Sequence, residues 1–185
     1  MSHKNVLAVD FGASSGRVML GNFDGNRLSI QEIHRFPNDP VILNGTMYWD
    51  FLRLFFEVKQ GLIKAKKYGK IDSIGLDTWG VDFGLIDKEG NLLENPVHYR
   101  DARTAGMLEK SFGKMDKDRF YQITGSQFME INTVFQLLAL LEKRPGLLEG
   151  TSRLLLMPDL FNYYLCGAQV SEYSIASTTQ MLDAR

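Results

Sequence analysis

The sequence predicts an α/β fold in which a mixed sheet carries helices on both faces. Three observations support this prediction: short apolar runs bounded by turn residues at the start of the chain, one amphipathic segment after residue 50, and mostly helical periodicity from residue 101 onward. Strands joined by tight turns pair antiparallel, whereas a later strand that follows a helix can lie parallel to its neighbour. A sheet with both kinds of pairing is therefore expected.

The first three strands are expected to form an antiparallel meander. Residues 5–10 and 17–21 are short, apolar and bounded by glycine, and the pair Asp24-Gly25 precedes a third run at residues 27–36. Residues 37–48 hold two prolines and an Asn-Gly pair, and we interpret them as a loop.

A helix and several further elements follow. Asp50 precedes apolar residues at helical spacing, which predicts an N-capped helix that ends near Gly69. The segment "KIDSIGLDTWG" is predicted to be a buried strand, and "VDFGLIDKEGNLLE" a further strand with a turn. Helical signals then cover residues 101–112, 116–123 and 132–143, and a strand at 154–157 leads into a helix from Pro158.

Length and charge limit the domain organisation and the classes of partner. A chain of 185 residues has the size of one large domain, so we expect residues 1–185 to form a single domain. The formal net charge of −1 lacks the basic excess of nucleic-acid-binding proteins, and the short lysine cluster at residues 64–70 is interpreted as solvated surface. No apolar stretch approaches the roughly 20 residues of a membrane helix. We expect no nucleic-acid or membrane partner, and the oligomeric state stays open.

The cysteine and histidine content bears on compartment and chemistry. Cys166 is the only cysteine, which excludes an intramolecular disulfide and a cysteine metal cluster and fits a reducing compartment. The apolar run before Asp10 is too short for a signal peptide, so a cytoplasmic location is expected. Three histidines do not assemble a Ser/His/Asp triad or a histidine metal site.

The first candidate site is the turn in "AVDFGASSGRVMLG". Small residues let several backbone N–H groups approach phosphate oxygens, the serine hydroxyls add donors, and an arginine adds a charge. An aspartate at the end of the first strand suits a hydrated Mg²⁺. The alternative is an ordinary glycine hairpin whose aspartate accepts bonds from the turn. The candidate phosphate-binding residues are Gly12, Ala13, Ser14, Ser15, Gly16 and Arg17, and the candidate metal residue is Asp10.

The second candidate site is "GLDTWGVDFG". A sugar could stack on Trp79 while Asp82 accepts from its hydroxyl groups; Thr78 adds a polar side chain and Gly80 permits close approach. The alternative is a buried tryptophan at a bulge, with Asp77 and Asp82 satisfied by neighbouring N–H groups.

The third candidate is "HYRDART". Arg100 and Arg103 are suited to a charged or polyol partner, whereas Asp101 can be either a ligand or a helix cap. His98 is interpreted as a packed residue, because no nucleophile lies near it in sequence.

Segments of one family pattern recur along the chain: "VDFGASSGRVML", "EIHRF", "IDSIGLDTWGVDFGLID", "YRDART" and "LLLMPDLF". Together they resemble the N-terminal domain of the FGGY carbohydrate kinases and cover nearly the whole chain. The resemblance implies a ribonuclease-H-like fold, the actin/hexokinase-like ATPase domain, which sugar kinases share with hexokinase, actin and the Hsp70 ATPases. "DTWGVDF" followed by "YRDAR" is similar to the branch that phosphorylates L-rhamnulose. Glycerol kinases carry Gln-Arg-Glu and xylulokinases Gln-Met-His where this sequence has Trp79-Gly80-Val81, which disfavours both.

The resemblance also implies a reaction. The family branch transfers the ATP γ-phosphate to the 1-hydroxyl of L-rhamnulose, with ATP and Mg²⁺, and gives L-rhamnulose 1-phosphate and ADP. It implies that residues 13–17 lie on the ATP phosphate loop, that Asp10 lies on the Mg²⁺ side and that Gly80 contacts the sugar. The family's general base, an aspartate, and most of its adenine pocket lie in a second domain. We therefore expect no catalytic base in this chain and no activity from it alone.

Other functions remain open at this point. One is a kinase for another ketose or polyol, such as xylulose, fuculose or glycerol. A second is a non-catalytic nucleotide-binding module of the actin or Hsp70 kind, and a third is an interaction domain. Trp79, Asp82 and the segment Arg100–Arg103 favour a polar small-molecule pocket over the non-catalytic module. An exposed apolar patch without a pocket would support the interaction domain.

Overall fold

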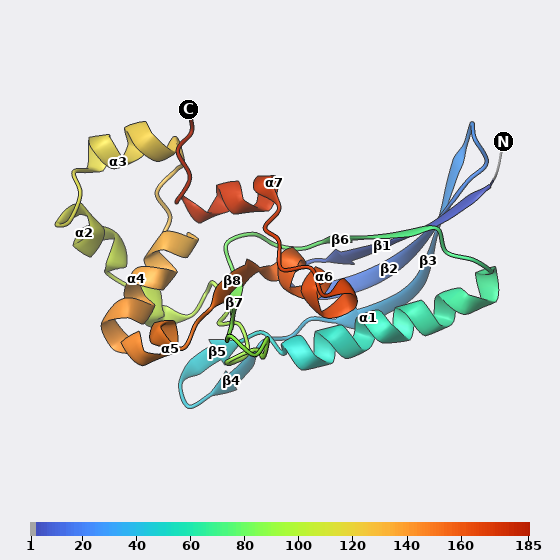
Figure 1. Cartoon of the computed structure of the whole chain (residues 1–185), viewed down its shortest axis with the longest axis horizontal. Helices are drawn as coiled ribbons and strands as arrows, with labels where there is room; N and C mark the ends of the chain where they lie inside the picture. The colour runs from blue at the N-terminus through green and yellow to red at the C-terminus, as the bar shows by residue number, and fades with distance from the viewer. Residues whose placement is uncertain (1–2) are drawn as a thin grey trace. The chain divides into compact units, whose positions relative to one another are not determined.

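The computed structural model describes residues 3–185, and its contacts divide the chain into two compact units. Unit 1 comprises Met1–Pro40 and Asp50–Trp79, and unit 2 comprises Val41–Trp49 and Gly80–Arg185. Figure 1 follows the chain through both units by colour. The organisation of residues 1–185 as a single domain stays a prediction.

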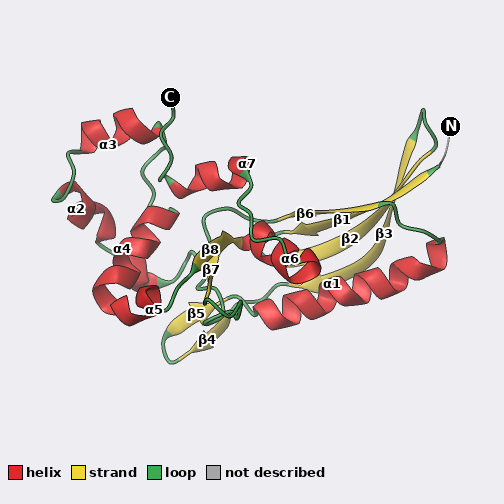
Figure 2. Ribbon diagram, in the orientation of Figure 1, coloured by secondary structure: helices red, strands yellow, loops and turns green. Residues whose placement is uncertain are grey.

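Unit 1 contains a four-stranded sheet in the order β3-β2-β1-β6. Its strands are β1 (Lys4–Phe11), β2 (Ser15–Phe23), β3 (Leu28–Pro37) and β6 (Ser73–Asp77). β1 pairs antiparallel with β2 and parallel with β6, and β2 pairs antiparallel with β3. Figure 2 shows these strands side by side. The predicted meander and the mixed sheet are therefore confirmed.

One helix packs against this sheet. α1 (Phe51–Ala65) begins after Asp50, whose side chain accepts from the Arg53 N–H as predicted, and the 3-10 turn η1 (Lys66–Tyr68) follows it. α1 packs against β2 and β3. Gly61 makes this packing close, because a Cβ there would overlap the side chain of Val18. α1 thus covers one sheet face; helices on both faces stay a prediction.

The structure corrects two predictions about individual segments. Residues 37–48, predicted to be a loop, contain the hairpin of β4 (Val41–Leu43) and β5 (Thr46–Tyr48), which belongs to unit 2. Its turn residues Asn44 and Gly45 both have positive φ, at 50° and 78°. This is the backbone that an Asn-Gly hairpin turn requires, so the pair carried a hairpin signal that the two prolines obscured.

The second correction concerns β6. This strand was predicted to be buried, yet Ser73, Ile74 and Gly75 are exposed. The reason is its position in unit 1, where it is an edge strand of the sheet and pairs only with β1 among the described residues. A short apolar run therefore indicated a strand but not its burial.

Unit 2 is built mainly of helices around a two-stranded sheet. β7 (Phe83–Ile86) pairs antiparallel with β8 (Arg153–Leu156), and buried Phe83, Leu85, Leu140 and Leu156 form one core cluster. The helical elements are η2 (Ala102–Thr104), α2 (Met107–Phe112), α3 (Lys117–Thr124), α4 (Thr133–Lys143), α5 (Pro145–Glu149), α6 (Met157–Cys166), α7 (Tyr173–Ala176) and η3 (Ser177–Thr179).

The predicted helices of unit 2 are mostly present, but the one expected at 101–112 is interrupted. Asp101 caps η2, and Gly106, with φ at 75°, separates η2 from α2. A positive φ breaks helical continuity, which explains the two short elements. α5 and α7 were not predicted. Within residues 3–185 no helix combines the length and apolar character needed to cross a membrane.

Candidate functional site

The glycine-serine turn of unit 1 connects β1 to β2 at residues 12–14. The Gly12 N–H donates to the Ser15 carbonyl at 2.9 Å, which closes the turn. Buried Asn38 holds it from behind: its N–H donates to the Ser14 carbonyl at 3.0 Å, and its Nδ2 donates to the Gly12 carbonyl at 2.8 Å. Gly12, Ala13 and Ser14 are exposed. The carbonyl groups of Gly12 and Ser14 are thus engaged by Asn38, and the exposed face of the turn carries small residues.

This geometry suits an anion. Within residues 3–185 the N–H groups of Ala13 and Ser14 make no hydrogen bond, so they are free to donate to an oxygen from outside. Successive backbone N–H groups and a serine hydroxyl are a common phosphate-binding arrangement. The turn therefore fits a phosphate group, because its exposed residues are small and leave the N–H groups accessible.

Gly16 has a packing role. It is buried, and a Cβ built on it would overlap the ring of Phe36 in β3. Phe36 in turn packs edge-on against Phe11, with ring centroids 5.6 Å apart. The absence of a side chain at Gly16 is therefore explained by the core of unit 1, independently of any ligand.

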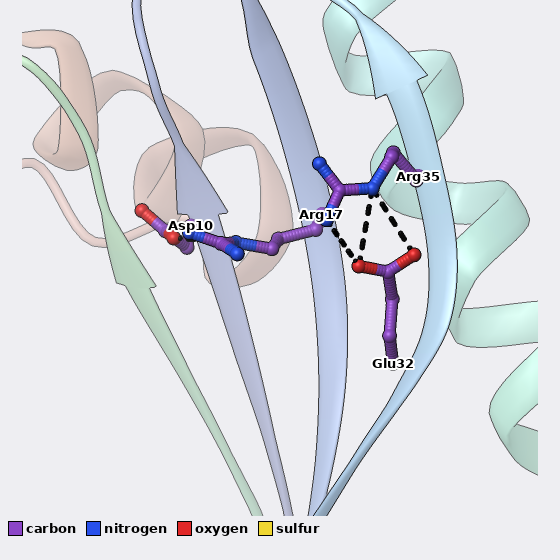
Figure 3. A network of polar contacts seen from close by, with 4 residues as sticks. All are labelled: Asp10, Arg17, Glu32 and Arg35. Atoms are coloured by element: carbon purple, nitrogen blue, oxygen red, sulfur yellow. Dashed lines mark hydrogen bonds and ion pairs between the residues drawn. The ribbon is translucent and has the colours of Figure 1, made fainter.

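Charged residues form a row across the sheet of unit 1. Asp77, Asp10, Arg17 and Arg35 are in register on the adjacent strands β6, β1, β2 and β3. Figure 3 shows Arg17 reaching toward Asp10, with Nε to Oδ2 at 2.8 Å, and Arg35 reaching toward Glu32. Hydrogen bonds from Arg35 lower the pKa of Glu32. Within the row of four, the two aspartates lie on β6 and β1 and the two arginines on β2 and β3.

The acidic side of this row fits a magnesium ion that is bound mainly through water and phosphate. Asp10 and Asp77 lie at the carboxyl ends of two parallel strands, where α/β proteins commonly bind ligands. No group of three or more His, Cys, Asp or Glu residues that could hold a metal exists within residues 3–185. Mg²⁺ commonly uses one or two carboxylates and keeps its waters, so this donor set suits it. Asp77 was not predicted as a site residue, although its place at a strand end was a usable signal.

Trp79 ends unit 1 beside the turn. Its ring packs edge-on against Phe11, the residue before the turn, with centroids 6.4 Å apart. Trp79 is only partly buried. Thr78 donates through Oγ1 to the Trp79 carbonyl at 2.8 Å. The structure therefore brings Trp79 and the predicted phosphate turn to the same end of β1.

The second segment of unit 2, Gly80–Arg185, begins with a strained turn. Val81 has φ at 68°, and the Asp82 N–H donates to the Gly80 carbonyl at 2.9 Å. A hydrogen bond across three residues with positive φ at the central one is a γ-turn of the rare, strained kind. A β-branched residue at positive φ is a genuine outlier. The predicted sugar contact Gly80 is thus part of a backbone that is held in an unfavourable conformation.

Asp82 is fully buried, with 0% of its surface exposed. Its Oδ2 accepts from Trp49 Nε1 at 2.6 Å and from the Tyr99 N–H at 3.1 Å, and its Oδ1 accepts from Gln136 Nε2 at 2.8 Å. Three donors thus converge on one carboxylate and hold it in place. The predicted contact of Asp82 with a sugar hydroxyl stays a prediction, and the geometry gives this residue a second role in fixing the turn.

Arg103 joins the same network through Gln136. Its Nη2 donates to Gln136 Oε1 at 2.5 Å, while its buried Nε has no hydrogen-bond partner within residues 3–185. Burial lowers the pKa of Arg103, although Asp82 and Asp101 oppose this effect. Asp101 acts as a cap: its Oδ1 accepts from the Arg103 N–H at 2.9 Å and its Oδ2 from the Met47 N–H at 2.8 Å.

Arg100 differs from Arg103 in being exposed; its guanidinium lies 5.3 Å from the centroid of the Tyr99 ring. His98 is buried, as predicted, and stacks on Trp49 at 3.9 Å between ring centroids. Burial lowers the pKa of His98 to about 4, so the ring is neutral at pH 7. Its Nδ1 accepts from the Arg100 N–H at 3.0 Å. Of the two arginines in the third predicted segment, Arg100 is the exposed one.

A separate hollow of about 610 Å³ lies among α3, α4 and the end of the chain, also in unit 2. None of the predicted sugar or phosphate residues lines it. A sugar needs several polar partners, so this hollow does not fit one. Its lining is mostly apolar and includes Met115, Phe120, Val134, Leu137, Leu138 and Leu141.

Sequence reasoning missed the residues that hold these segments in place. Asn38 supports the turn of unit 1, and Trp49, Thr133, Gln136 and Thr178 surround the strained turn of unit 2. Each is far in sequence from the residue that it contacts, and no local pattern marks such partners. A polar residue on the apolar face of a helix, such as Gln136, could have indicated a buried hydrogen-bond partner, but not which one.

The family model for the N-terminal domain of the FGGY family of carbohydrate kinases matches residues 5–185. A rhamnulokinase of Bacteroides thetaiotaomicron is 44% identical over 98% of this chain, and a rhamnulokinase of Oceanobacillus iheyensis is 44% identical over 96%. The chain spans 38% of the length of each of these relatives.

Solved structures support the fold. A gluconate kinase from Lactobacillus acidophilus matches 98% of this chain and 37% of its own with a TM-score of 0.85, at 17% identity. A Plasmodium falciparum glycerol kinase with ADP matches 97% of this chain and 38% of its own with a TM-score of 0.74, at 18% identity. The predicted fold class, that of the actin- and hexokinase-like ATPases, agrees with these neighbours. On the family match and the two relatives, the chain belongs to the FGGY family of carbohydrate kinases, and residues 5–185 represent its N-terminal domain.

Proposed function

We propose that this chain is part of an ATP-dependent kinase that phosphorylates the 1-hydroxyl of L-rhamnulose and forms L-rhamnulose 1-phosphate and ADP. One observation carries the proposal: 44% identity to two proteins named rhamnulokinase, over nearly the whole chain. The gluconate kinase and the glycerol kinase of known structure are 17% and 18% identical to this chain, so they support the fold alone.

The turn of unit 1 would hold the phosphate groups of ATP. The free N–H groups of Ala13 and Ser14, with the serine hydroxyls, donate to phosphate oxygens, while Arg17 adds a positive charge next to the turn. Asn38 keeps the turn open by engaging its carbonyl groups. Because these groups are held in place before ATP arrives, little reorganisation accompanies binding.

Asp10 would hold Mg²⁺ through water, with Asp77 beside it. When bound, Mg²⁺ neutralises charge that develops on the phosphate oxygens during transfer. Arg17 keeps one oxygen of Asp10 engaged at 2.8 Å and so fixes the direction of its carboxylate.

Gly80 and Trp79 would contact the sugar, with Thr78, Asp82, Arg100, Asp101 and Arg103 as the further residues of the proposed site. Partly buried Trp79 would provide a stacking surface, and Gly80, beside which Thr178 fills the side-chain position, would contact the sugar through its backbone. We infer that the general base and most of the adenine pocket belong to a second domain, which corresponds to the part of the relatives that this chain does not match. A cytoplasmic location and the absence of nucleic-acid and membrane partners stay predictions.

The test is a substrate panel on the full-length protein that carries this chain. Release of ADP would be measured with ATP, Mg²⁺ and each of L-rhamnulose, xylulose, fuculose, glycerol and gluconate. We expect the highest kcat/KM with L-rhamnulose, by about tenfold or more, because substrate choice reflects differential binding in the transition state. A higher kcat/KM with another compound, or ADP release that no sugar stimulates, would contradict the proposal.

A further inference from the structure

The backbone of the Gly80–Asp82 turn is strained at Val81, its central residue. Val81 has φ at 68°, a region that glycine or asparagine enters much more easily. Such a conformation persists only where the surroundings determine it, and strained residues cluster at ligand-binding sites. The partners of the turn therefore indicate what the strain serves.

Both backbone polar groups of Val81 are held by side chains from other elements. The Val81 N–H donates to Thr178 Oγ1 at 3.1 Å, and the Thr178 hydroxyl in turn donates to the Ile175 carbonyl at 2.8 Å. The Val81 carbonyl accepts from Thr133 Oγ1 at 2.7 Å and from Gln136 Nε2 at 3.3 Å. Thr133 and Gln136 belong to α4, so the turn is fixed from η3 and from α4 at once.

Thr178 also limits the space beside Gly80. A Cβ at Gly80 would lie 3.0 Å from Thr178 Cγ2 and 3.2 Å from its Oγ1. Thr178 therefore lies against two successive residues of the turn: its hydroxyl accepts from the Val81 N–H, and its side chain lies beside Gly80. Gln136 contributes similarly at the other side, because the same amide contacts the Val81 carbonyl and the Asp82 carboxylate.

We propose that Thr178, Thr133 and Gln136 are positioning residues that hold the strained Gly80–Asp82 turn in the conformation that receives the sugar. This inference rests on the proposed function, since it assumes that Gly80 contacts the substrate. Thr178 is its most specific member, because one hydroxyl both orders the Val81 N–H and shapes the surface at Gly80. Holding the backbone in advance reduces the ordering that binding would otherwise require.

The experiment compares variants of the full-length protein. Thr178→Val removes the acceptor and keeps the β-branched shape, whereas Thr178→Ser keeps the hydroxyl. We expect Thr178→Val to raise the KM for the sugar about tenfold and to change the KM for ATP less than about twofold. Thr178→Ser should restore the sugar KM to within about threefold of the unmodified protein. Thr179→Val is the matched control, because its hydroxyl also donates to a carbonyl, that of Ala176, and accepts from an N–H, that of Met181, but neither of these partners belongs to the turn.

A second pair of variants guards against a folding defect. Val81→Gly and Val81→Ala both remove the two methyl groups of valine, but only glycine adopts positive φ without strain. We expect Val81→Gly to melt at a higher temperature than Val81→Ala, and both to raise the sugar KM. The inference is overturned if the KM for the sugar is unchanged in both Thr178→Val and Val81→Gly. It is also overturned if the KM for the sugar and the KM for ATP rise equally and the melting temperature falls.

The two proposals fail in different ways. If the unmodified protein prefers another sugar, the proposed function fails, and the same split of KM values is then measured on that preferred sugar. If L-rhamnulose is preferred but the Thr178 and Val81 variants leave its KM unchanged, the proposed function holds and the positioning role is refuted.

Discussion

Arg17 donates from Nε to Asp10 Oδ2 at 2.8 Å, across the paired strands β1 and β2. The two side chains remain 46% and 42% exposed, so this is a surface ion pair. Pairs of this kind contribute little to stability, because water and salt screen them. A change at Asp10 should therefore affect chemistry far more than folding.

In the full-length protein, Asp10→Asn should lower the kcat of the proposed sugar phosphorylation about 100-fold or more and change the KM for the sugar less than about threefold. The reason is that a group that positions Mg²⁺ acts mainly on charge developing in phosphoryl transfer. Steady-state ADP release at saturating ATP measures both constants. Glu32→Gln is the matched control, because Glu32 also pairs with an exposed arginine of this sheet. A parallel change in kcat and KM together with a lower melting temperature would indicate a folding defect instead.

Gly16→Ala separates packing from phosphate binding. A Cβ at Gly16 would overlap the Phe36 ring inside the core, so the variant should lose about 1–3 kcal/mol of stability through overpacking. Combining it with Phe36→Leu should recover part of that loss, because the smaller side chain makes room. Thermal unfolding measures both effects.

Gly75→Ala is the control for this prediction, because a Cβ at Gly75 meets nothing within 4 Å. If Gly16→Ala leaves the melting temperature unchanged and raises the KM for ATP, the role of Gly16 lies in the nucleotide site and not in the core.

These cases show which features the sequence could predict. The turn at residues 12–14, the N-cap at Asp50 and the first strands depend on neighbouring residues, and local patterns predicted them. The hairpin at Val41–Tyr48 was missed although its Asn-Gly turn is a local signal, because two prolines favoured a loop. Burial of β6 was predicted wrongly, because burial depends on which elements cover a strand.

The support of the site could not be predicted for a physical reason. Asp82 has partners at Trp49 and Gln136, and Val81 at Thr178, a separation of 97 positions. Hydrogen bonds over such distances depend on the completed fold, and no periodicity encodes them. The positive φ of Val81 is similarly invisible, because valine is a residue that normally avoids it.

His98 should make the protein less stable in mild acid. Burial lowers its pKa to about 4, whereas the unfolded chain takes up a proton near the ordinary value of 6.5. Between these two values the unfolded state binds more protons, so stability falls as the pH decreases from 6.5 toward 4. From pH 7 to pH 5 this group accounts for a loss of about 2 kcal/mol.

His98→Phe tests this, because phenylalanine keeps a ring next to Trp49 and carries no titratable group. Denaturant unfolding at pH 7 and pH 5 should show a smaller decrease in stability for the variant than for the unmodified protein. Equal decreases in the two proteins would show that His98 does not titrate as its burial implies.

Asp159 should have the opposite effect on stability with pH. It is only 2% exposed; its Oδ1 accepts from the Glu172 N–H at 3.2 Å, and its Oδ2 is buried without a hydrogen-bond partner in residues 3–185. Burial is the main cause that raises its pKa above 3.8, and the charge of Glu172 adds to it. A raised pKa means that the folded state holds its proton more tightly, so the contribution of Asp159 is favourable at low pH and is lost as the pH rises through the folded pKa.

Asp159→Asn should therefore stabilise the protein at pH 7, by roughly 1 kcal/mol or less, because it keeps the Oδ1 acceptor and removes a buried charge. The gain should shrink as the pH falls, since protonation makes the native carboxyl neutral as well. Asp159→Ala separates charge from hydrogen bonding: it removes the acceptor for the Glu172 N–H and leaves a small cavity, so it should destabilise the protein at every pH. Unfolding curves of the three proteins at pH 4, 5.5 and 7 provide the comparison. The prediction is contradicted if Asp159→Asn is less stable than the unmodified protein at pH 7 and by the same amount at pH 4. Asp159 would then be charged in the folded state and hydrogen-bonded to a partner such as a bound water.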